Sequence, residues 1–95
     1  MINSADTDIP EFNSSEPNIG REVHQYMKSA RMSATWLAGR MCCDRTNIYK
    51  ILGRRSLDTA TLYKISYFLQ HDFFSVYTKA FEELNEKNKE NSHPQ

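Results

Sequence analysis

The chain has 95 residues, and its twelve Lys and Arg side chains are balanced by twelve Asp and Glu. This length fits one small domain and excludes a large enzyme core. Apolar residues make up 39% of the chain and aromatic residues 12%, which allows a core of modest size. No stretch approaches the roughly 18 to 20 apolar residues of a membrane span, and the N-terminus lacks the features of a signal peptide. We therefore expect a cytoplasmic protein.

The cysteines and histidines do not have the spacing of a disulfide framework or a metal site. Cys42 and Cys43 are neighbours, and adjacent residues cannot link distant parts of a chain. The three histidines stand apart, without the paired spacing of zinc ligands. We therefore predict that both thiols are small apolar packing groups, and that the chain has neither a metal nor a cofactor site.

The two signs of charge are segregated along the chain. Residues 1–17 carry four acids and no base, a net charge of −4. Residues 18–70 carry nine Lys and Arg against three Asp and Glu, a net charge of +6, and residues 71–95 have a net charge of −2. Because clustered bases attract phosphates, the middle segment favours a polyanionic partner. A solvated charged face would explain the same pattern, so charge alone does not decide between them.

Both ends of the chain lack an apolar period. Residues 1–17 are rich in Asn, Ser, Asp, Glu and Pro, so we predict a disordered acidic arm. Residues 85–95 are polar and are predicted to be a flexible tail. The folded unit is therefore expected at residues 18–84.

Three helices are predicted in the first half of this unit. Asn18 can cap the first, whose apolar residues have the spacing of one buried stripe: Ile19, Val23, Tyr26, Met27 and Ala30. Ser33 precedes a second helix of about two turns that ends near Met41. Asp44 can cap a third helix, which Gly53 can end. The inward side of this third helix is formed by Ile48, Ile51 and Leu52.

Two further helices are predicted in the second half. Asp58 can cap a helix with Leu62, Ile65 and Leu69 on one face. Asp72 can cap the last helix, whose large residues are Phe73, Tyr77, Ala80, Phe81 and Leu84. No segment alternates with the period of a strand over a useful length. The predicted fold class is therefore all-α, with five helices.

The aromatic residues are predicted to be mostly core, because a domain of this length has few other large side chains. This set comprises Trp36, Tyr63, Phe68, Phe73, Phe74, Tyr77 and Phe81. The last two helices carry more apolar surface than the other helices can cover. Phe74, Tyr77 and Phe81 are therefore candidates for a homodimer contact.

The second and third helices are separated by only about three residues. Such a short connection forces a steep crossing between helices and excludes an antiparallel hairpin. Ala38 suits this crossing, since a larger side chain at the contact would separate the two helices. The sequence therefore predicts a helix-turn-helix.

The segment from Met32 to Arg55 reads MSATWLAGRMCCDRTNIYKILGRR. With its cap, Leu-Ala pair, turn, polar helix start, Ile and basic end, it resembles the lambda-repressor-like, Cro and Xre family of DNA-binding domains. The resemblance covers about residues 18–84, because the first and fourth helices also fall where that five-helix fold has them. Family members usually have Gly at the turn position held here by Cys42. A left-handed conformation at Cys42 would cost on the order of 1 kcal/mol.

The resemblance implies a sequence-specific DNA-binding transcriptional regulator, with the helix of about residues 45–52 in the major groove. The helical wheel independently turns Thr46 and Lys50 outward, flanked by Asn47 and Tyr49, with Arg45 at the exposed start. These side chains can pair with base edges, so we predict that all five read bases. The alternative is a solvated helix face.

Four further residues are predicted to contact DNA phosphates. Ser33 and Thr35 lie at the start of the second helix, where free amides favour an anion. Arg54 and Arg55 match the basic stretch that follows the recognition helix in the family. The alternatives are simple capping for Ser33 and a solubilising role for the two arginines.

The sequence contains none of the residue patterns that support catalysis. Paired carboxylates, a nucleophile with a nearby base and a glycine-rich phosphate loop are all missing, so we do not expect an enzyme. We expect double-stranded DNA as the partner, with no membrane and no small-molecule ligand. The alternatives are a protein-interaction module, such as an antitoxin-like partner of a toxin protein, and a helix-turn-helix used only for assembly.

Overall fold

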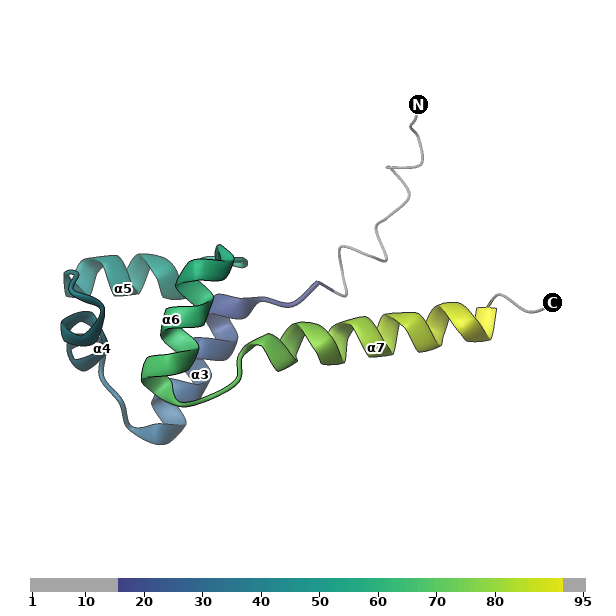
Figure 1. Cartoon of the computed structure of the whole chain (residues 1–95), viewed down its shortest axis with the longest axis horizontal. Helices are drawn as coiled ribbons and strands as arrows, with labels where there is room; N and C mark the ends of the chain where they lie inside the picture. The colour runs from purple at the N-terminus through teal and green to yellow at the C-terminus, as the bar shows by residue number, and fades with distance from the viewer. Residues whose placement is uncertain (1–15, 92–95) are drawn as a thin grey trace, which may run out of the picture.

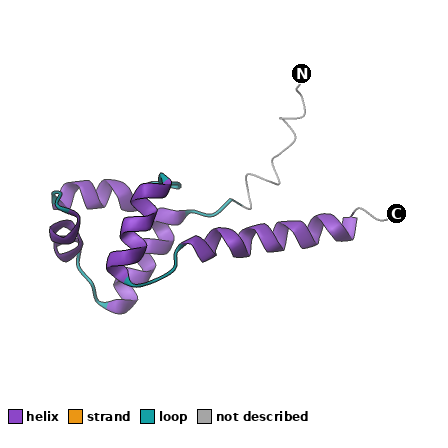
Figure 2. Ribbon diagram, in the orientation of Figure 1, coloured by secondary structure: helices purple, strands orange, loops and turns teal. Residues whose placement is uncertain are grey.

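The computed structural model describes residues 16–91, and within them the chain folds into five helices without a strand (Figures 1 and 2). The predicted all-α class is confirmed. The helices are α3 (Ile19–Ala30), α4 (Ala34–Met41), α5 (Arg45–Leu52), α6 (Thr59–Leu69) and α7 (Phe74–Asn91). In this part of the chain, no helix combines the length and the apolar character needed to cross a bilayer. The predicted arm of residues 1–17 lies outside the described residues except for its last two.

Three of the predicted caps form. The side chains of Asn18, Ser33 and Asp58 each accept a hydrogen bond from the backbone N–H three residues later, at 3.1, 3.0 and 2.7 Å. These bonds satisfy amides that would otherwise lack a partner in the first turn. The cap predicted at Asp44 does not form. Asp44 precedes α5 in extended conformation, but its side chain makes no cap hydrogen bond. The Asp72 side chain accepts a hydrogen bond from the amide of Phe74 at 3.0 Å. α7 begins at Phe74, so Phe73, which was expected in this helix, precedes it.

Three helices end in the same way, on a residue in the left-handed conformation. These residues are Arg31, Cys42 and Gln70, with φ of 58°, 56° and 53°. In each case the next amide donates back to a carbonyl in the last helical turn, at 2.9 to 3.0 Å, as in a Schellman motif. Gly53, the predicted end of α5, has φ −88° and does not use the freedom of glycine.

The core is formed by one apolar stripe from each of α3 to α6 and by the residue before α7. α4 packs on both α5 and α6, and α3 packs on α5. The buried side chains are Ile19, Val23, Met27, Leu37, Ala38, Ile48, Ile51, Leu62, Ile65, Leu69 and Phe73. Ala30, predicted to continue the stripe of α3, is exposed in the last turn.

The aromatic residues are less buried than predicted. Of the seven expected to be mostly core, only Phe73 is fully buried. Trp36, Tyr63 and Phe81 are 37%, 68% and 64% exposed. Phe68, Phe74 and Tyr77 are half-buried against the core. The core prediction is wrong for Trp36 and Tyr63, because they lie beside the buried stripes of α4 and α6. Phe81, which is also a candidate for the homodimer contact, lies on α7 away from the core.

α7 extends away from the body formed by α3 to α6 (Figure 1). Its 18 residues correspond to a length of about 27 Å. The helix continues to Asn91, so the segment expected to be a polar tail from Asn85 is helical over its first seven residues. Over residues 81–87, the exposed side chains outnumber the half-buried ones.

Candidate nucleic-acid interface

The candidate site is built on the close pair of α4 and α5. Three residues, Cys42 to Asp44, connect the two helices. Ala38 is 5% exposed at the contact, and Leu37 and Ile48 are fully buried beside it. Cys42 adopts φ 56° and ψ 47°, and the amide of Cys43 donates to the carbonyl of Ala38 at 3.0 Å. The turn therefore has the left-handed residue at the position where the resemblance expects glycine.

α5 has one buried side and one polar side. Ile48 and Ile51 anchor it in the core, whereas the five predicted base-reading residues are all exposed: Arg45, Thr46, Asn47, Tyr49 and Lys50. Within residues 16–91, none of these five side chains forms an intramolecular hydrogen bond. α5 itself contains no acidic residue. The donors on this side of α5 are therefore available to an external ligand.

The start of α4 carries the first two predicted phosphate-binding residues. The Ser33 hydroxyl accepts from the amide of Trp36 at 3.0 Å, so the capping alternative describes what this side chain does in the structure. A hydroxyl that accepts still has its own proton to donate. Thr35 is exposed in the first turn of α4.

The loop after α5 carries the other two predicted phosphate-binding residues, and α3 holds its backbone. The amides of Ile19 and Gly20 donate to the carbonyls of Arg55 and Arg54 at 2.9 and 3.0 Å. These amides are in the first turn of α3, which has no acceptors of its own for them. Both arginine side chains are exposed. The helix at the start of the described chain therefore positions the basic loop at the end of α5.

Gly20 is the residue that permits this contact, and its role was not predicted from the sequence. A Cβ at this position would overlap the carbonyl oxygen of Arg54 and lie 2.6 Å from that of Leu52. The signal in the sequence is a glycine in the first turn of a helix, where a better helix former would be expected. That signal does not indicate which distant carbonyls require the glycine.

Arg55 also contacts the segment before α3. Its guanidinium donates to the backbone carbonyl of Glu16 at 2.9 Å. Because a guanidinium has five N–H donors, this bond leaves others for a ligand. The described chain therefore begins directly beside the basic loop.

A pair of side chains on the exposed side of α4 was not predicted from the sequence. The guanidinium carbon of Arg40 lies 5.3 Å from the centre of the Trp36 ring, within the range of a cation–π interaction. The two residues are four apart on one helix, a spacing that brings side chains together. This spacing could have indicated the pair from the sequence.

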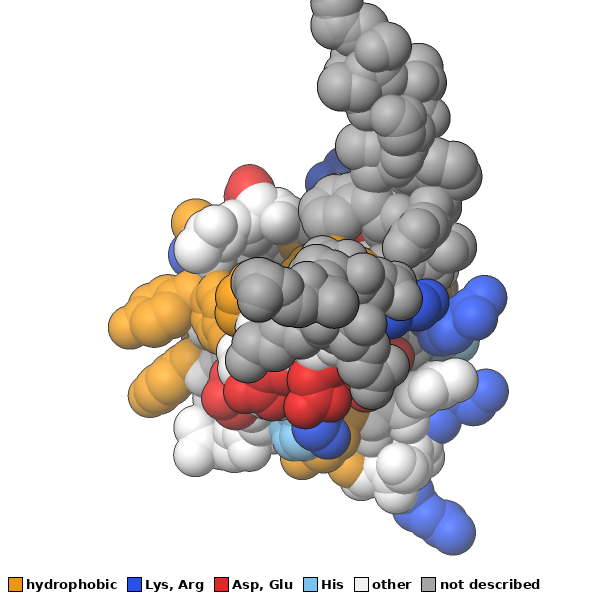
Figure 3. Space-filling model, turned by 90° about the vertical axis from the view of Figure 1, so that its right-hand side faces the viewer, with side chains coloured by type: hydrophobic (Ala, Val, Ile, Leu, Met, Phe, Trp, Pro, Cys, Tyr) orange, Lys and Arg blue, Asp and Glu red, His pale blue; other side chains and the backbone are white. Residues whose placement is uncertain are grey.

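Most basic and most apolar side chains lie on opposite sides in one view of the molecule (Figure 3). Viewed from the right-hand side of Figure 1, Lys and Arg gather on one side, apolar side chains protrude from the other, and acidic side chains lie between them (Figure 3).

Two of the described side chains have shifted pKa values. Hydrogen bonds from the side chain and amide of Thr61 lower the pKa of Asp58, with smaller contributions from Lys64 and Arg54. Burial, followed by the charge of Glu16, raises the pKa of Tyr77.

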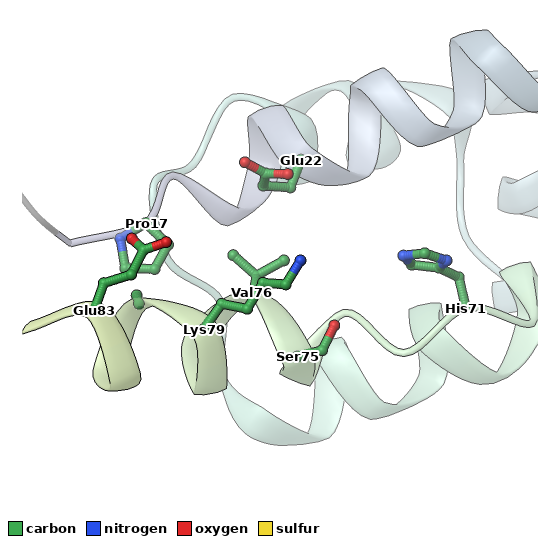
Figure 4. A pocket seen from close by; sticks show the side chains of 8 residues that line it. Pro17, Glu22, His71, Ser75, Val76, Lys79 and Glu83 are labelled. Carbon is green, nitrogen blue, oxygen red and sulfur yellow. The ribbon is translucent and has the colours of Figure 1, made fainter. Parts of the chain in front are cut away.

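A shallow hollow of about 400 Å³ lies between α3 and α7. Figure 4 shows Glu22 on α3 facing Val76 and Lys79 on α7. The hollow is lined by Pro17, Glu22, His71, Ser75, Val76, Lys79, Ala80 and Glu83. None of the predicted DNA-contacting residues is among them. Over residues 16–91, no group of three His, Cys, Asp or Glu side chains has a metal-binding arrangement.

Comparison with known proteins finds no family model, no curated protein and no solved structure that matches the chain.

Proposed function

We propose that this chain is a sequence-specific DNA-binding transcriptional regulator, acting in the cytoplasm as a helix-turn-helix domain of the lambda-repressor-like kind. The observation that carries the proposal is the two-sided character of α5. Two buried isoleucines and a three-residue turn hold the helix in place, while five polar or basic side chains on it stay exposed and unpaired within the described chain. Its function is binding, without catalysis, a cofactor or a small-molecule ligand.

α5 acts as the recognition helix and lies in the major groove. An α-helix with its side chains is about 10 to 12 Å across, comparable to the width of that groove. Arg45 and Lys50 donate to guanine acceptors, and Asn47 pairs with adenine. Thr46 offers a methyl group to thymine, and Tyr49 contacts the base edges beside it.

Phosphate contacts come from both ends of the α4–α5 pair. Ser33 and Thr35 lie at the start of α4, where the helix dipole favours an anion. Arg54 and Arg55 follow α5, in a loop whose backbone α3 holds. These contacts supply affinity and orientation but carry no sequence information.

The test is fluorescence anisotropy on DNA selected from a random pool, at several salt concentrations, for wild type and for Arg45→Ala/Lys50→Ala. The double variant should lose its preference for the selected sequence and keep weak, salt-sensitive binding. The matched control, Lys79→Ala/Lys87→Ala, removes the same charge from α7 and should keep the preference. Absence of wild-type binding even at low salt would refute the proposal.

The regulator is further proposed to act as a homodimer through α7. Phe81 is 64% exposed on a helix that extends from the body, and Tyr77 and Phe74 lie one and two turns before it. A stripe of this kind normally packs against another helix. A two-fold dimer would match a two-fold DNA site.

The exposed side chain of Phe81 favours one alternative function, a protein-interaction module such as an antitoxin-like partner of a toxin protein. In that case Phe81 and its neighbours contact a different chain. Purification of the chain together with the product of a neighbouring gene, in a complex that Phe81→Glu disrupts, would favour this alternative.

A further inference from the structure

The segment before α3 joins the body beside the proposed phosphate-binding residues. Residues 1–15 lie outside the described residues, and they connect to Glu16. The carbonyl of Glu16 accepts from the guanidinium of Arg55 at 2.9 Å. Two residues later α3 begins, with its first amides bonded to the carbonyls of Arg54 and Arg55. Any group carried by residues 1–15 is therefore tethered next to the basic end of α5.

The charge of this segment is opposite to that of the surface beside it. Residues 1–15 contain three carboxylates, at Asp6, Asp8 and Glu11, and no Lys or Arg. Between the flanking Asp44 and Asp58, α5 and the loop after it carry four bases and no acid: Arg45, Lys50, Arg54 and Arg55. All four are exposed. Tethered opposite charges raise the local concentration of one near the other.

The length of the segment suits this surface. α5 is about 12 Å long, so its start lies roughly that distance from the loop that holds Arg54. An extended chain covers up to about 3.5 Å per residue. Glu11 can therefore reach about 17 Å from Glu16, and Asp6 about 35 Å. All three carboxylates can reach the bases along α5.

We infer that residues 1–15 occupy the basic surface of α5 and its following loop when DNA is absent, and compete with DNA for it. The inference rests on the proposed function, because it assigns regulation to the same surface. The acidic residues of α7 do not have this role, since α7 extends away from α5 (Figure 1). DNA phosphates must displace the carboxylates, so the segment lowers affinity for every sequence and excludes weakly binding ones.

The test uses the full chain with Asp6→Asn, Asp8→Asn and Glu11→Gln. Its matched control, Glu82→Gln/Glu83→Gln/Glu86→Gln, removes the same number of charges from α7. Without DNA and at low salt, the amide NMR signals of Lys50, Arg54 and Arg55 should shift in the segment variant and stay unchanged in the control. Added salt should move the wild-type signals towards those of the variant, because screening weakens exposed charge pairs.

DNA affinity provides the second measurement. By anisotropy at low salt, the segment variant should bind selected DNA about tenfold more tightly than wild type, and the gap should narrow as salt rises. Identical NMR signals in variant and wild type would overturn the inference, even if DNA binding tightened, because the segment would then only repel DNA. Shifted signals together with no DNA binding by either chain would refute the proposed function, and with it the competition.

Discussion

Gly20 is the residue at which α3 and the loop after α5 approach most closely. We expect Gly20→Ala to lower the free energy of unfolding by about 1 to 3 kcal/mol, because its Cβ would meet two backbone carbonyls that cannot move independently. Urea denaturation measures the change. Gly39→Ala is the control: a Cβ there meets no atom within 4 Å, and alanine favours the helix by up to about 1 kcal/mol. Equal stability of the two variants would contradict the close approach.

Cys42 is the non-glycine residue that makes the turn between α4 and α5. Cys42→Gly should raise the free energy of unfolding by about 0.5 kcal/mol, because relief of the left-handed conformation outweighs the added freedom of the unfolded chain. Thermal and urea unfolding together measure this gain. Cys42→Ala keeps a Cβ and removes the thiol, so it should leave stability unchanged. A similar gain in Cys42→Ala would attribute the effect to the thiol and not to the backbone.

At the scale of a structural element, Ser33 caps α4 and is also proposed to contact phosphate. Ser33→Ala should cost about 1 kcal/mol of stability and Ser33→Gly only a few tenths, because glycine is tolerated at a cap. If the hydroxyl also binds phosphate, both variants lose DNA affinity to a similar extent. Anisotropy at matched salt separates the two roles. If Ser33→Gly instead binds DNA like wild type, and DNA affinity follows stability across the variants, Ser33 is only a helix cap.

The cap of α6 makes the stability of the fold depend on pH. Hydrogen bonds from Thr61 lower the pKa of Asp58 below its ordinary value near 3.8. A group with a lowered folded-state pKa stabilises the fold above the unfolded-state value, and this contribution is lost as pH falls through the folded-state pKa. The stability difference between wild type and Asp58→Ala should therefore shrink as pH falls below about 4. Urea unfolding at a series of pH values measures it, and a difference independent of pH would contradict the assignment.

Helix positions were predictable because each element carries its own start signal and apolar period. Asn18, Ser33 and Asp58 mark the first residues of three helices, and the stripes behind them predict which side is buried. Periodicity does not reveal how much surface the neighbouring helices can cover. The exposure of Ala30 and Tyr63 therefore differed from the prediction.

At the scale of the whole molecule, α7 is the element with the least support from the body. We expect wild type to sediment as a dimer at tens of micromolar with a two-fold DNA site, because the stripe containing Phe81 then packs against its copy. Phe81→Glu should sediment as a monomer and bind a single half-site with unchanged preference. Asn85→Glu, which adds the same charge at an exposed position of the same helix, serves as the control. A monomeric wild type, with and without DNA, would end the dimer proposal.

The candidate site was predictable to the extent that it lies within one short segment. The exposed side of α5 follows from the positions of Ile48 and Ile51 on the same helix. The support from α3 was not predictable, because Gly20 and Arg54 are far apart in the sequence and no local pattern pairs them. The residues that present the surface were therefore accessible from the sequence, whereas those that hold it in place required the fold.

The bonds from the first turn of α3 to the loop after α5 also affect hydrogen exchange. Amides at the start of a helix usually exchange quickly with solvent, because they lack acceptors within the helix. Those of Ile19 and Gly20 are bonded to Arg55 and Arg54, so they exchange only when this loop detaches from α3. Their exchange rates therefore report how often the end of α5 opens. DNA bound at the end of α5 would therefore slow hydrogen exchange at these two amides without contacting α3.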